Sequence, residues 1–456
     1  MNDIKIETRI DNNLSHSAAA LLQALKNMQC EDDAGIFQPG PEVGQLREYL
    51  ATYKGNLYDA VLGRLEDLIG LGGIEVVSQD VLLNLIKRVW NRKVSKLNGT
   101  EVKAITGLLK CPHLSIKDLA RQIDLSYGQT RRAIEQLQST SILEFKSIPN
   151  VAKLGLDRIL IELEEPETLL ISPYITRYLF VDGPIRRVFL IALFPSNYRD
   201  QILRVVRTLR RDSQSATAWR LSTGKPHFSA KYYDRRKKRW HVNELHFRLL
   251  LRTDHDLAMG ELPTVSKLSF PPKMSETEVM IIDHLMEDYN ASAREIADSV
   301  DASESMVYRY RSKIQSKKLA IPRARISVPL FTDRIIGTCT PAVSAKIMHA
   351  WKRLPLTYIS QISNIENHRE RKVLLTTALP AGGAETIIEA LTSENLMVRE
   401  FQLYKMDASL SSSFRFSNRY DHMVGNWLWD SDDIDITTYP TMRSNAESTN
   451  LPLDLA

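Results

Sequence analysis

The chain has 456 residues, 43% of them hydrophobic and 25% charged, which is the balance of a folded protein with room for three or four small domains. It contains no unbroken apolar stretch of about 18 residues and starts with polar residues, so we expect neither a membrane span nor a secretory signal. The three cysteines, Cys30, Cys111 and Cys339, lie far apart, which argues against a zinc cluster and for a reducing cytoplasm. A net charge of +5 excludes no class of partner by itself.

The N-terminal region, residues 1–98, is expected to be helical. Residues 15–28 and 79–96 have the spacing of helices, and the second of these helices has a basic face. Between them, residues 41–78 admit two interpretations. Their apolar spacing is that of a third, degenerate winged helix, and the alternative is a plain helical bundle.

Residues 116–142 and 294–319 share one spacing of apolar and small residues. Ala120 aligns with Ala297 at an offset of 177 residues, and further matches then fall in register. The matches are Ile123 with Val300, Asp124 with Asp301, Ser126 with Ser303, Leu137 with Ile314 and Ile142 with Leu319. A small residue permits a close helix crossing, and the serine after a short turn begins the next helix. We therefore predict two winged helix-turn-helix domains, residues 99–150 and 273–328, although a three-helix core without DNA contacts has the same spacing.

The second helix of each unit is the one that the major groove of DNA accepts. Helix geometry places several side chains on its exposed side, toward base edges and phosphates. They are Tyr127, Gln129, Arg131 and Arg132 in the first unit, and Ser305, Tyr308, Arg309 and Lys313 in the second. Because the two sets differ, we expect one asymmetric site in double-stranded DNA.

A second repeat follows each unit. Asp157 to Ile159 and Asp333 to Ile335 each open an apolar strand, at an offset of 176 residues. The first copy then predicts a helix at 167–176, strands at 177–181 and 185–194, a helix at 197–210 and a strand at 217–222. The second predicts a helix at 343–353, strands at 358–363 and 371–379, a helix at 384–394 and a strand at 397–406. Both orders are βαββαβ, the ferredoxin-like arrangement, so we expect an α+β fold with modules at residues 151–226 and 329–408.

Residues 227–272 form an insertion between the two copies. Residues 231–241 hold six basic residues and one acid between two alternating stretches, 228–233 and 240–251, which predicts a β-hairpin with a basic tip. The tip residues Arg235, Arg236, Lys237, Lys238 and Arg239 are candidates for contacts to DNA phosphates. Tyr232, Tyr233 and Trp240 would pack beneath the tip or stack on bases. A solvated hairpin end is the alternative.

The C-terminal region, residues 409–456, is aromatic and acidic before it becomes polar. Trp427, Trp429 and four aspartates lie within residues 427–435, and we expect this stretch to fold back on the protein or to dock on a partner. Low hydrophobicity predicts disorder after Thr437.

In this order of elements the chain resembles the leucine-responsive regulator/AsnC (feast/famine) family. The resemblance covers residues 99–222 and 274–407, and Lys153 to Leu156 look like the family's junction between wing and first strand. It implies a tandem-fused transcription regulator of the cytoplasm and nucleoid, whose halves form a pseudo-dimer within one chain. The family's second module implies a small-molecule effector, for which the corresponding turns are residues 182–184 and 366–370. Homo-oligomer formation stays open.

Two other classes of function are compatible with the same modules. The modules also resemble the siroheme decarboxylase family, which implies a tetrapyrrole cavity with His and Arg residues; the candidates are His349, His368, Arg369 and Arg371, with Arg186 and Arg187 in the first copy. A partner-docking protein would use its winged helices for protein contacts. The chain has no Walker-type loop, His-Glu-x-x-His or Gly-x-Ser-x-Gly motif, so we expect no enzyme activity, cofactor or metal.

Overall fold

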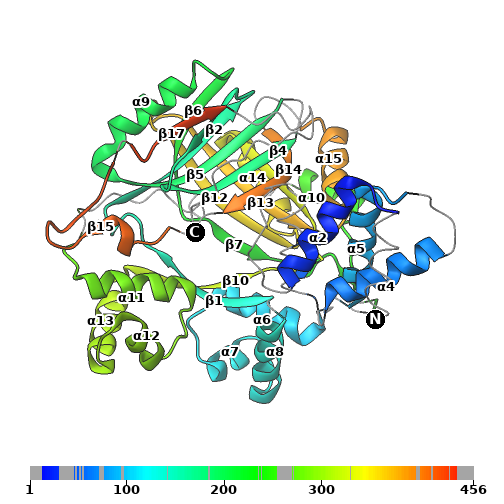
Figure 1. The fold of residues 1–456 in the computed structure, drawn as a ribbon, viewed down its shortest axis with the longest axis horizontal. Coiled ribbons are helices and arrows are strands. Elements are labelled where there is room, and N and C mark those ends of the chain that lie inside the picture. Colours follow the sequence, from blue (N-terminus) through cyan, green and yellow to red (C-terminus); the bar gives the residue numbers. More distant parts are fainter. Residues whose placement is uncertain are drawn as a thin grey trace.

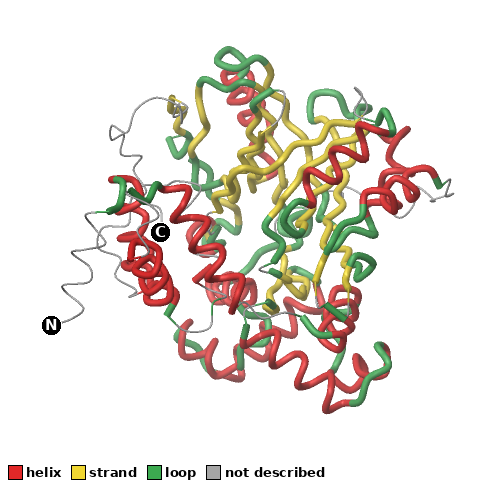
Figure 2. Tube along the Cα trace, turned by 90° about the vertical axis from the view of Figure 1, so that its right-hand side faces the viewer, coloured by secondary structure: helices red, strands yellow, loops and turns green. Residues whose placement is uncertain are grey.

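The computed structural model describes most of the chain between residues 13 and 438. The described ranges are 13–29, 56–70, 76–93, 97–140, 142–182, 185–234, 236–237, 239–253, 272–328, 330–396, 401–411, 414–430 and 432–438, with the single positions 46, 49, 50, 53 and 270. Strands lie at the centre of the molecule, and helices surround them (Figures 1 and 2). None of the helices in these ranges has both the length and the apolar character to cross a membrane.

The N-terminal region contains three helices, α2 (His16–Gln29), α4 (Leu57–Gly70) and α5 (Gln79–Lys93). They enclose their own hydrophobic core, in which the rings of Tyr49 and Trp90 lie 4.6 Å apart. The extended contact found here is a parallel bridge between Leu14 and Val77. Residues 71–75, which would form the turn of a third winged helix, lie outside the described residues. The described part of this region is a helical bundle.

Two three-helix units follow the predicted repeat. The first has α6 (Gly99–Lys110), α7 (Ile116–Gln122) and α8 (Tyr127–Ser139), and the second has α11 (Glu276–Glu287), α12 (Ala293–Val300) and α13 (Glu304–Lys317). We call them the first and second HTH units. Ser126 and Ser303 cap α8 and α13, and the turns before them hold Asp124 and Asp301 in the left-handed conformation, at φ 54° and 50°. The repeat therefore extends to backbone conformation.

Gly107 sets the approach of two helices in the first HTH unit. A Cβ atom there would lie 2.6 Å from Ile123 Cγ2 and 2.7 Å from Leu119 Cδ1. We expect Gly107→Ala to lower the free energy of unfolding by about 1–3 kcal/mol, because the tight contact would be overpacked. Gly128, in α8, has no atom within 4 Å of such a Cβ, so Gly128→Ala should stabilise by about 0.5–1 kcal/mol. Urea unfolding of both variants tests these expectations. Equal losses of unfolding free energy in the two variants would contradict the close helix contact at Gly107.

The strands after the HTH units pair with each other. β1 (Leu143–Pro149) and β10 (Ala320–Ile326) form an antiparallel ribbon from Leu143↔Ile326 to Pro149↔Ala320. We call this pair the ribbon. Each unit thus contributes one strand to a shared ribbon, whereas we predicted two separate wings.

Each half then forms its sheet module. Module 1 has β2 (Leu156–Glu164), β3 (Thr168–Ile171), β4 (Ile175–Asp182), β5 (Arg187–Pro195), α9 (Arg199–Leu209) and β6 (Ser215–Leu221). Module 2 has β11 (Asp333–Cys339), α14 (Pro341–Trp351), β12 (Leu356–Asn364), β13 (Arg371–Leu379), α15 (Gly383–Ser393) and β14 (Phe401–Ser411). Module 2 is βαββαβ as predicted. In module 1 the helix predicted at 167–176 is wrong, because a short strand stands there between Pro166 and Pro173, and proline disrupts helix interiors.

The two modules close into one barrel. The strand order is β13-β11-β14-β4-β5-β2-β6-β12-β7, and β12 also pairs with β13, so eight strands form a ring. β7 (Lys225–Phe228) lies beside β12. The modules meet at β14 with β4 and at β6 with β12, so the last strand of each module pairs with the second β-strand of the βαββαβ order in the other. This equivalence gives the barrel a pseudo-twofold symmetry.

The HTH units pack crosswise on this barrel. The hydrophobic core of the first unit continues through Tyr233, Trp240 and Phe331 into the outer core of module 2. The core of the second unit continues through Leu154 and Trp427 into that of module 1. Each unit therefore packs against the module of the other half, and not against the module that follows it in the sequence.

A C-terminal strap, residues 414–438, covers the outer face of module 1 beside α9. It contains β15 (Tyr420–Asp421), β16 (Asn426–Trp427) and β17 (Asp435–Thr438), and β17 pairs with β3. The Trp429 ring stacks on Tyr174 at 4.9 Å and on Tyr198 at 5.3 Å. Of the two alternatives for this stretch, the structure shows the fold-back, although onto aromatic side chains. Residues 439–456 lie outside the described residues.

Candidate functional site

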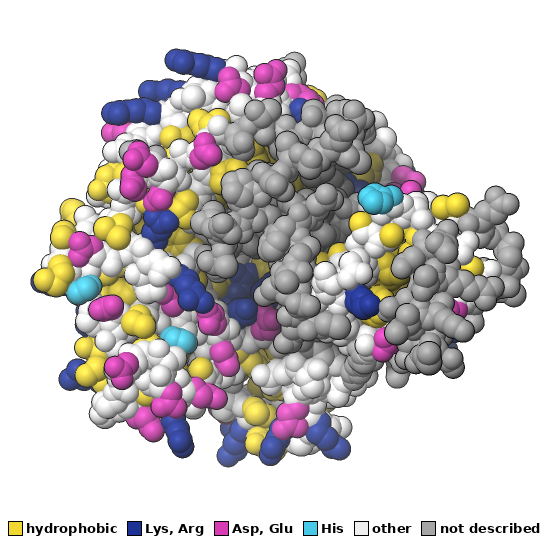
Figure 3. All heavy atoms as spheres, in the orientation of Figure 1, with side chains coloured by type: hydrophobic (Ala, Val, Ile, Leu, Met, Phe, Trp, Pro, Cys, Tyr) yellow, Lys and Arg dark blue, Asp and Glu magenta, His cyan; other side chains and the backbone are white. Residues whose placement is uncertain are grey.

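The predicted DNA-contacting residues lie on the exposed sides of α8 and α13. Tyr127 is 54% exposed and Tyr308 is 62% exposed. On the opposite sides of these helices, Thr130 and Val307 are buried and Tyr310 is half-buried. Lys and Arg side chains lie along the lower edge of the molecule, where both HTH units are (Figure 3).

Several of these side chains already have partners within the protein. Gln129 Oε1 accepts the Ser126 N–H at 3.0 Å and so completes the cap of α8. Arg131 pairs with Glu135 at 2.7 Å on an exposed surface, where such a pair is weak. Lys313 Nζ lies 2.5 Å from the buried Glu278 carboxylate, and the Arg309 guanidinium lies over the Tyr310 ring at 5.2 Å. Arg131 and Arg132 are therefore better placed for phosphates than Lys313.

The two HTH units differ in charge. Residues 99–140 hold six basic and four acidic residues, whereas residues 275–318 hold six basic and nine acidic residues. The first unit therefore has an excess of two basic residues and the second an excess of three acidic residues.

The basic insertion is smaller than predicted. β8 (Tyr233–Asp234) and β9 (Arg239–Trp240) form a short hairpin, and the stretch predicted as its second strand is mostly helix α10 (Glu244–Arg252), begun by an Asn243 cap. Arg236 and Lys237 follow Asp234, whose carboxylate accepts their N–H groups at 2.9 and 3.1 Å. Arg235 and Lys238 lie outside the described residues. Because Tyr232, Tyr233 and Trp240 are buried, they do not offer rings to bases.

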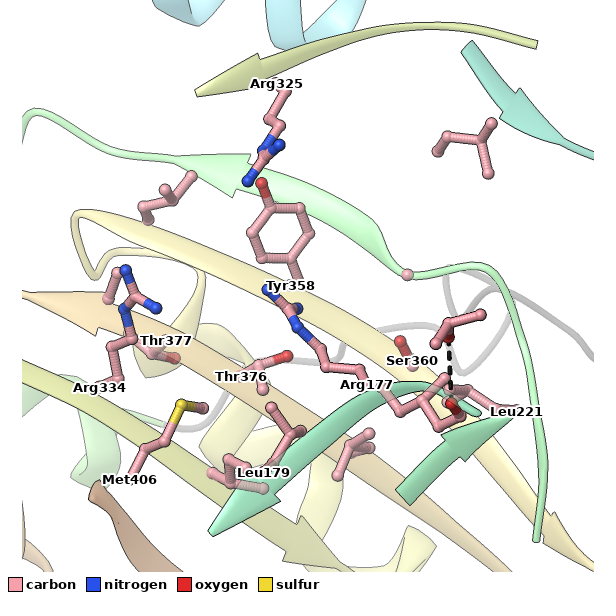
Figure 4. A pocket seen from close by; sticks show the side chains of 18 of the residues that line it. Arg177, Leu179, Leu221, Arg325, Arg334, Tyr358, Ser360, Thr376, Thr377 and Met406 are labelled. Atoms are coloured by element: carbon pink, nitrogen blue, oxygen red, sulfur yellow. Dashed lines mark hydrogen bonds between the residues drawn. The ribbon is translucent and has the colours of Figure 1, made fainter. Parts of the chain in front are cut away.

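A cavity of about 530 Å³ opens where the ribbon crosses one end of the barrel. Six basic side chains line it, and none of its described lining residues is acidic. They are Arg158 of β2, Arg177 of β4, Arg334 of β11, Lys146 of β1, and Arg323 and Arg325 of β10. In Figure 4 the Arg325 guanidinium lies beside the Tyr358 hydroxyl, and Arg177 and Arg334 lie farther from it in the same cavity. At the rim, Glu144 pairs with Lys146 at 3.3 Å and with Arg325 at 3.4 Å.

The floor of this cavity is apolar. Leu160, Leu179, Phe189, Ile336 and Leu374 point into the barrel beneath the arginines. Beyond them, buried polar side chains fill the other end. There Arg187 pairs with Glu162 and Glu164, lies 4.8 Å from the Tyr404 ring centre and donates to Gln402 at 3.1 Å. The cavity thus lies at the end of the barrel that the ribbon crosses, and buried side chains around Arg187 close the opposite end.

Two of the arginines, Arg158 and Arg177, have no carboxylate among the described groups that shift their pKa. Burial, followed by the nearby Arg323, lowers the pKa of Arg158 to about 10. Burial also lowers the pKa of Arg177, with contributions from Arg334, Arg325 and Arg323. Arg177 is open to the cavity space yet surrounded by protein, which explains why it is both accessible and desolvated. Both groups stay protonated at neutral pH, so the cavity is a site of concentrated positive charge.

The sequence held a signal for this site. In the repeated Asp-Arg-Ile triplets, Asp157 and Asp333 point outward, to Arg199 and to the N-terminus of α15, where the Ala384 N–H donates at 3.2 Å. Side chains alternate along a strand, so Arg158 and Arg334 must point to the opposite face. That face is a cavity wall only because the strands of both modules form a closed barrel. From the sequence we interpreted the triplets as the starts of two strands and did not predict the cavity.

The residues expected for a tetrapyrrole enzyme do not meet in this cavity. His368, Arg369 and Arg371 lie at the turn between β12 and β13, and Arg187 lies at the closed end of the barrel. Arg186 pairs with Glu165 at the edge of module 1. In one of the two turns proposed for an effector, Glu366 pairs with Arg207 of α9 and with Arg210, which follows that helix. In the other turn, Gly183 and Pro184 lie outside the described residues. No metal-binding group of His, Cys, Asp or Glu occurs among the described residues.

No protein-family model matches the chain, and no curated protein is similar to it in sequence. Its structure is similar to that of the siroheme decarboxylase NirDL, with 12% identity, a TM-score of 0.40, and coverage of 70% of this chain and 96% of that one. The same protein in complex with an iron-uroporphyrin III analogue gives a TM-score of 0.39 over 69% of this chain and 96% of that one, at 12% identity. PH0061 matches 27% of this chain and 92% of its own, with 18% identity and a TM-score of 0.22. No functional assignment follows from these likenesses.

Proposed function

We propose that this protein binds an amphipathic organic polyanion in the barrel cavity, and that the ligand belongs to the class of tetrapyrrole polycarboxylates. The observation that carries the proposal is the convergence of five arginines and Lys146 on one cavity whose described lining has no acid. Two of these cations, Arg158 and Arg177, are desolvated by the surrounding protein with no carboxylate beside them, and a desolvated charge that is not offset is costly. An anion that binds between them removes this cost, and arginine suits carboxylates because its guanidinium donates two parallel hydrogen bonds.

The apolar floor narrows the class of ligand. A sugar phosphate or a free inorganic anion would leave the floor of Leu160, Leu179 and Phe189 in contact with water. A tetrapyrrole with acidic side chains has an apolar macrocycle for the floor and carboxylates for the arginines. We assign no reaction to the site, because the described lining has no carboxylic acid, imidazole or thiol for proton transfer.

Absorption titration with uroporphyrin III tests this proposal. We expect a Soret shift with 1:1 stoichiometry and an affinity that falls as salt rises, since the contacts are charged. A tetracationic porphyrin has a similar macrocycle with the opposite charge and is the matched control ligand. Equal binding of both porphyrins, or binding of neither, would refute the proposal.

DNA binding by the first HTH unit is the second candidate, favoured by the excess of basic residues in that unit and by exposed Arg131 and Arg132. In gel shifts on DNA selected from random sequence, Arg131→Ala with Arg132→Ala should weaken binding about 10-fold or more and reduce the salt slope by about 2. Arg309→Ala, in the acidic second unit, is the matched variant and should change affinity less than about 3-fold. Equal losses of DNA affinity in the two variants would contradict the proposal that only the first HTH unit contacts DNA.

A further inference from the structure

The ribbon joins the cavity to the HTH units. It continues directly from α8 and α13, and its ends are fastened by two symmetric hydrogen bonds, from Asn150 N to Leu319 O at 2.8 Å and from Ser327 N to Ile142 O at 2.9 Å. The Tyr289 N–H of the second unit also donates to Phe145 O of β1 at 3.0 Å. The ribbon is therefore bonded to both halves at its ends and directly to the second HTH unit.

The same ribbon forms one wall of the cavity. Lys146 and Arg323 are direct cross-strand partners at its centre, on the pseudo-twofold axis that relates the two halves. They face the cavity together with Arg325, opposite Arg158, Arg177 and Arg334 of the barrel. Like charges thus face each other across the junction. The Glu144 carboxylate, which pairs with Lys146 and Arg325, and the contact of Arg323 with the Tyr358 ring at 4.8 Å offset part of this repulsion.

We propose that an anion bound in the cavity fixes the ribbon to the barrel and so fixes the positions of both HTH units. This coupling rests on the proposed function. An anion between the two groups of cations converts repulsion into attraction, and the ligand stabilises the closed junction more than an open one. By reciprocity, any partner that holds the HTH units in the same position must raise the affinity for the anion by an equal factor.

Amide hydrogen exchange with the full chain tests the coupling, with uroporphyrin III as the probe. At saturation we expect exchange in residues 143–149 and 320–326 to slow by about 10-fold or more. Arg323→Gln with Arg325→Gln removes two of the ribbon cations and should show a smaller response of the ribbon to saturating ligand than wild type. The matched variant Arg334→Gln removes a barrel cation and should bind more weakly but keep the ribbon response at saturation.

The outcomes separate the two proposals. Saturable binding with unchanged exchange in the ribbon would overturn the coupling and leave the binding function intact. An equal ribbon response in the Arg323/Arg325 variant and in wild type would also overturn it. The absence of any uroporphyrin binding would overturn the binding function and the coupling together.

Discussion

Replacing Arg158 by leucine should weaken uroporphyrin binding by about 30-fold or more and at the same time stabilise the ligand-free protein. Loss of a desolvated charge that contacts an oppositely charged group costs about 2–5 kcal/mol of binding free energy. In the ligand-free protein the substitution is expected to be favourable. The pKa of Arg158 is lowered to about 10 because folding disfavours its charged form, and leucine removes that cost. We expect a gain of about 1–3 kcal/mol in unfolding free energy. Titration calorimetry and urea unfolding measure the two effects.

The matched control is Arg204→Gln, which removes an exposed arginine from α9, away from the cavity. It lowers the net charge of the chain by the same amount and should change neither affinity nor stability noticeably. If Arg158→Leu destabilised the ligand-free protein, its guanidinium would have a structural partner, and the site would not be held open for an anion.

Trp427→Ala should lower the unfolding free energy by about 3–5 kcal/mol, the usual cost of truncating a buried aromatic residue. The Trp427 ring is 3% exposed, packs edge-on against Phe416 and Tyr420, and donates its Nε1–H to Leu154 O at 2.5 Å. Trp427→Phe keeps most of the packing but loses this hydrogen bond, at a cost of about 1 kcal/mol. Urea unfolding followed by circular dichroism measures both.

Leu428→Ala is the control beside it, because Leu428 is 47% exposed and its loss should be nearly neutral. Similar stability of the Trp427→Ala and Leu428→Ala variants would mean that the strap is not part of the folded core of module 1.

Local patterns predicted what depends on local contacts. The serine caps and the apolar spacing of the HTH units involve residues a few positions apart, so they could be predicted from the sequence alone. The strands around Asp182 were predicted for the same reason. The errors at 167–176 and 240–251 were also local, since Pro173 and the Asn243 cap were signals that apolar periodicity outweighed.

The cavity depends on long-range pairing, which periodicity does not encode. Arg158 and Arg334 are 176 positions apart, and they line one space only because β6 pairs with β12 and β14 with β4. Alternation along β2 indicates that Arg158 and Asp157 face opposite ways, but it does not say which face is enclosed. The shared ribbon was missed for the same reason.

The strap also has a consequence for synthesis on the ribosome. β6 ends at Leu221, whereas the side chains that cover module 1 come from residues 414–438. At a typical elongation rate, about 10–40 s separate the two segments, and during that time the outer face of module 1 lacks the cover of the strap. Slow codons between residues 221 and 414 would lengthen this exposure.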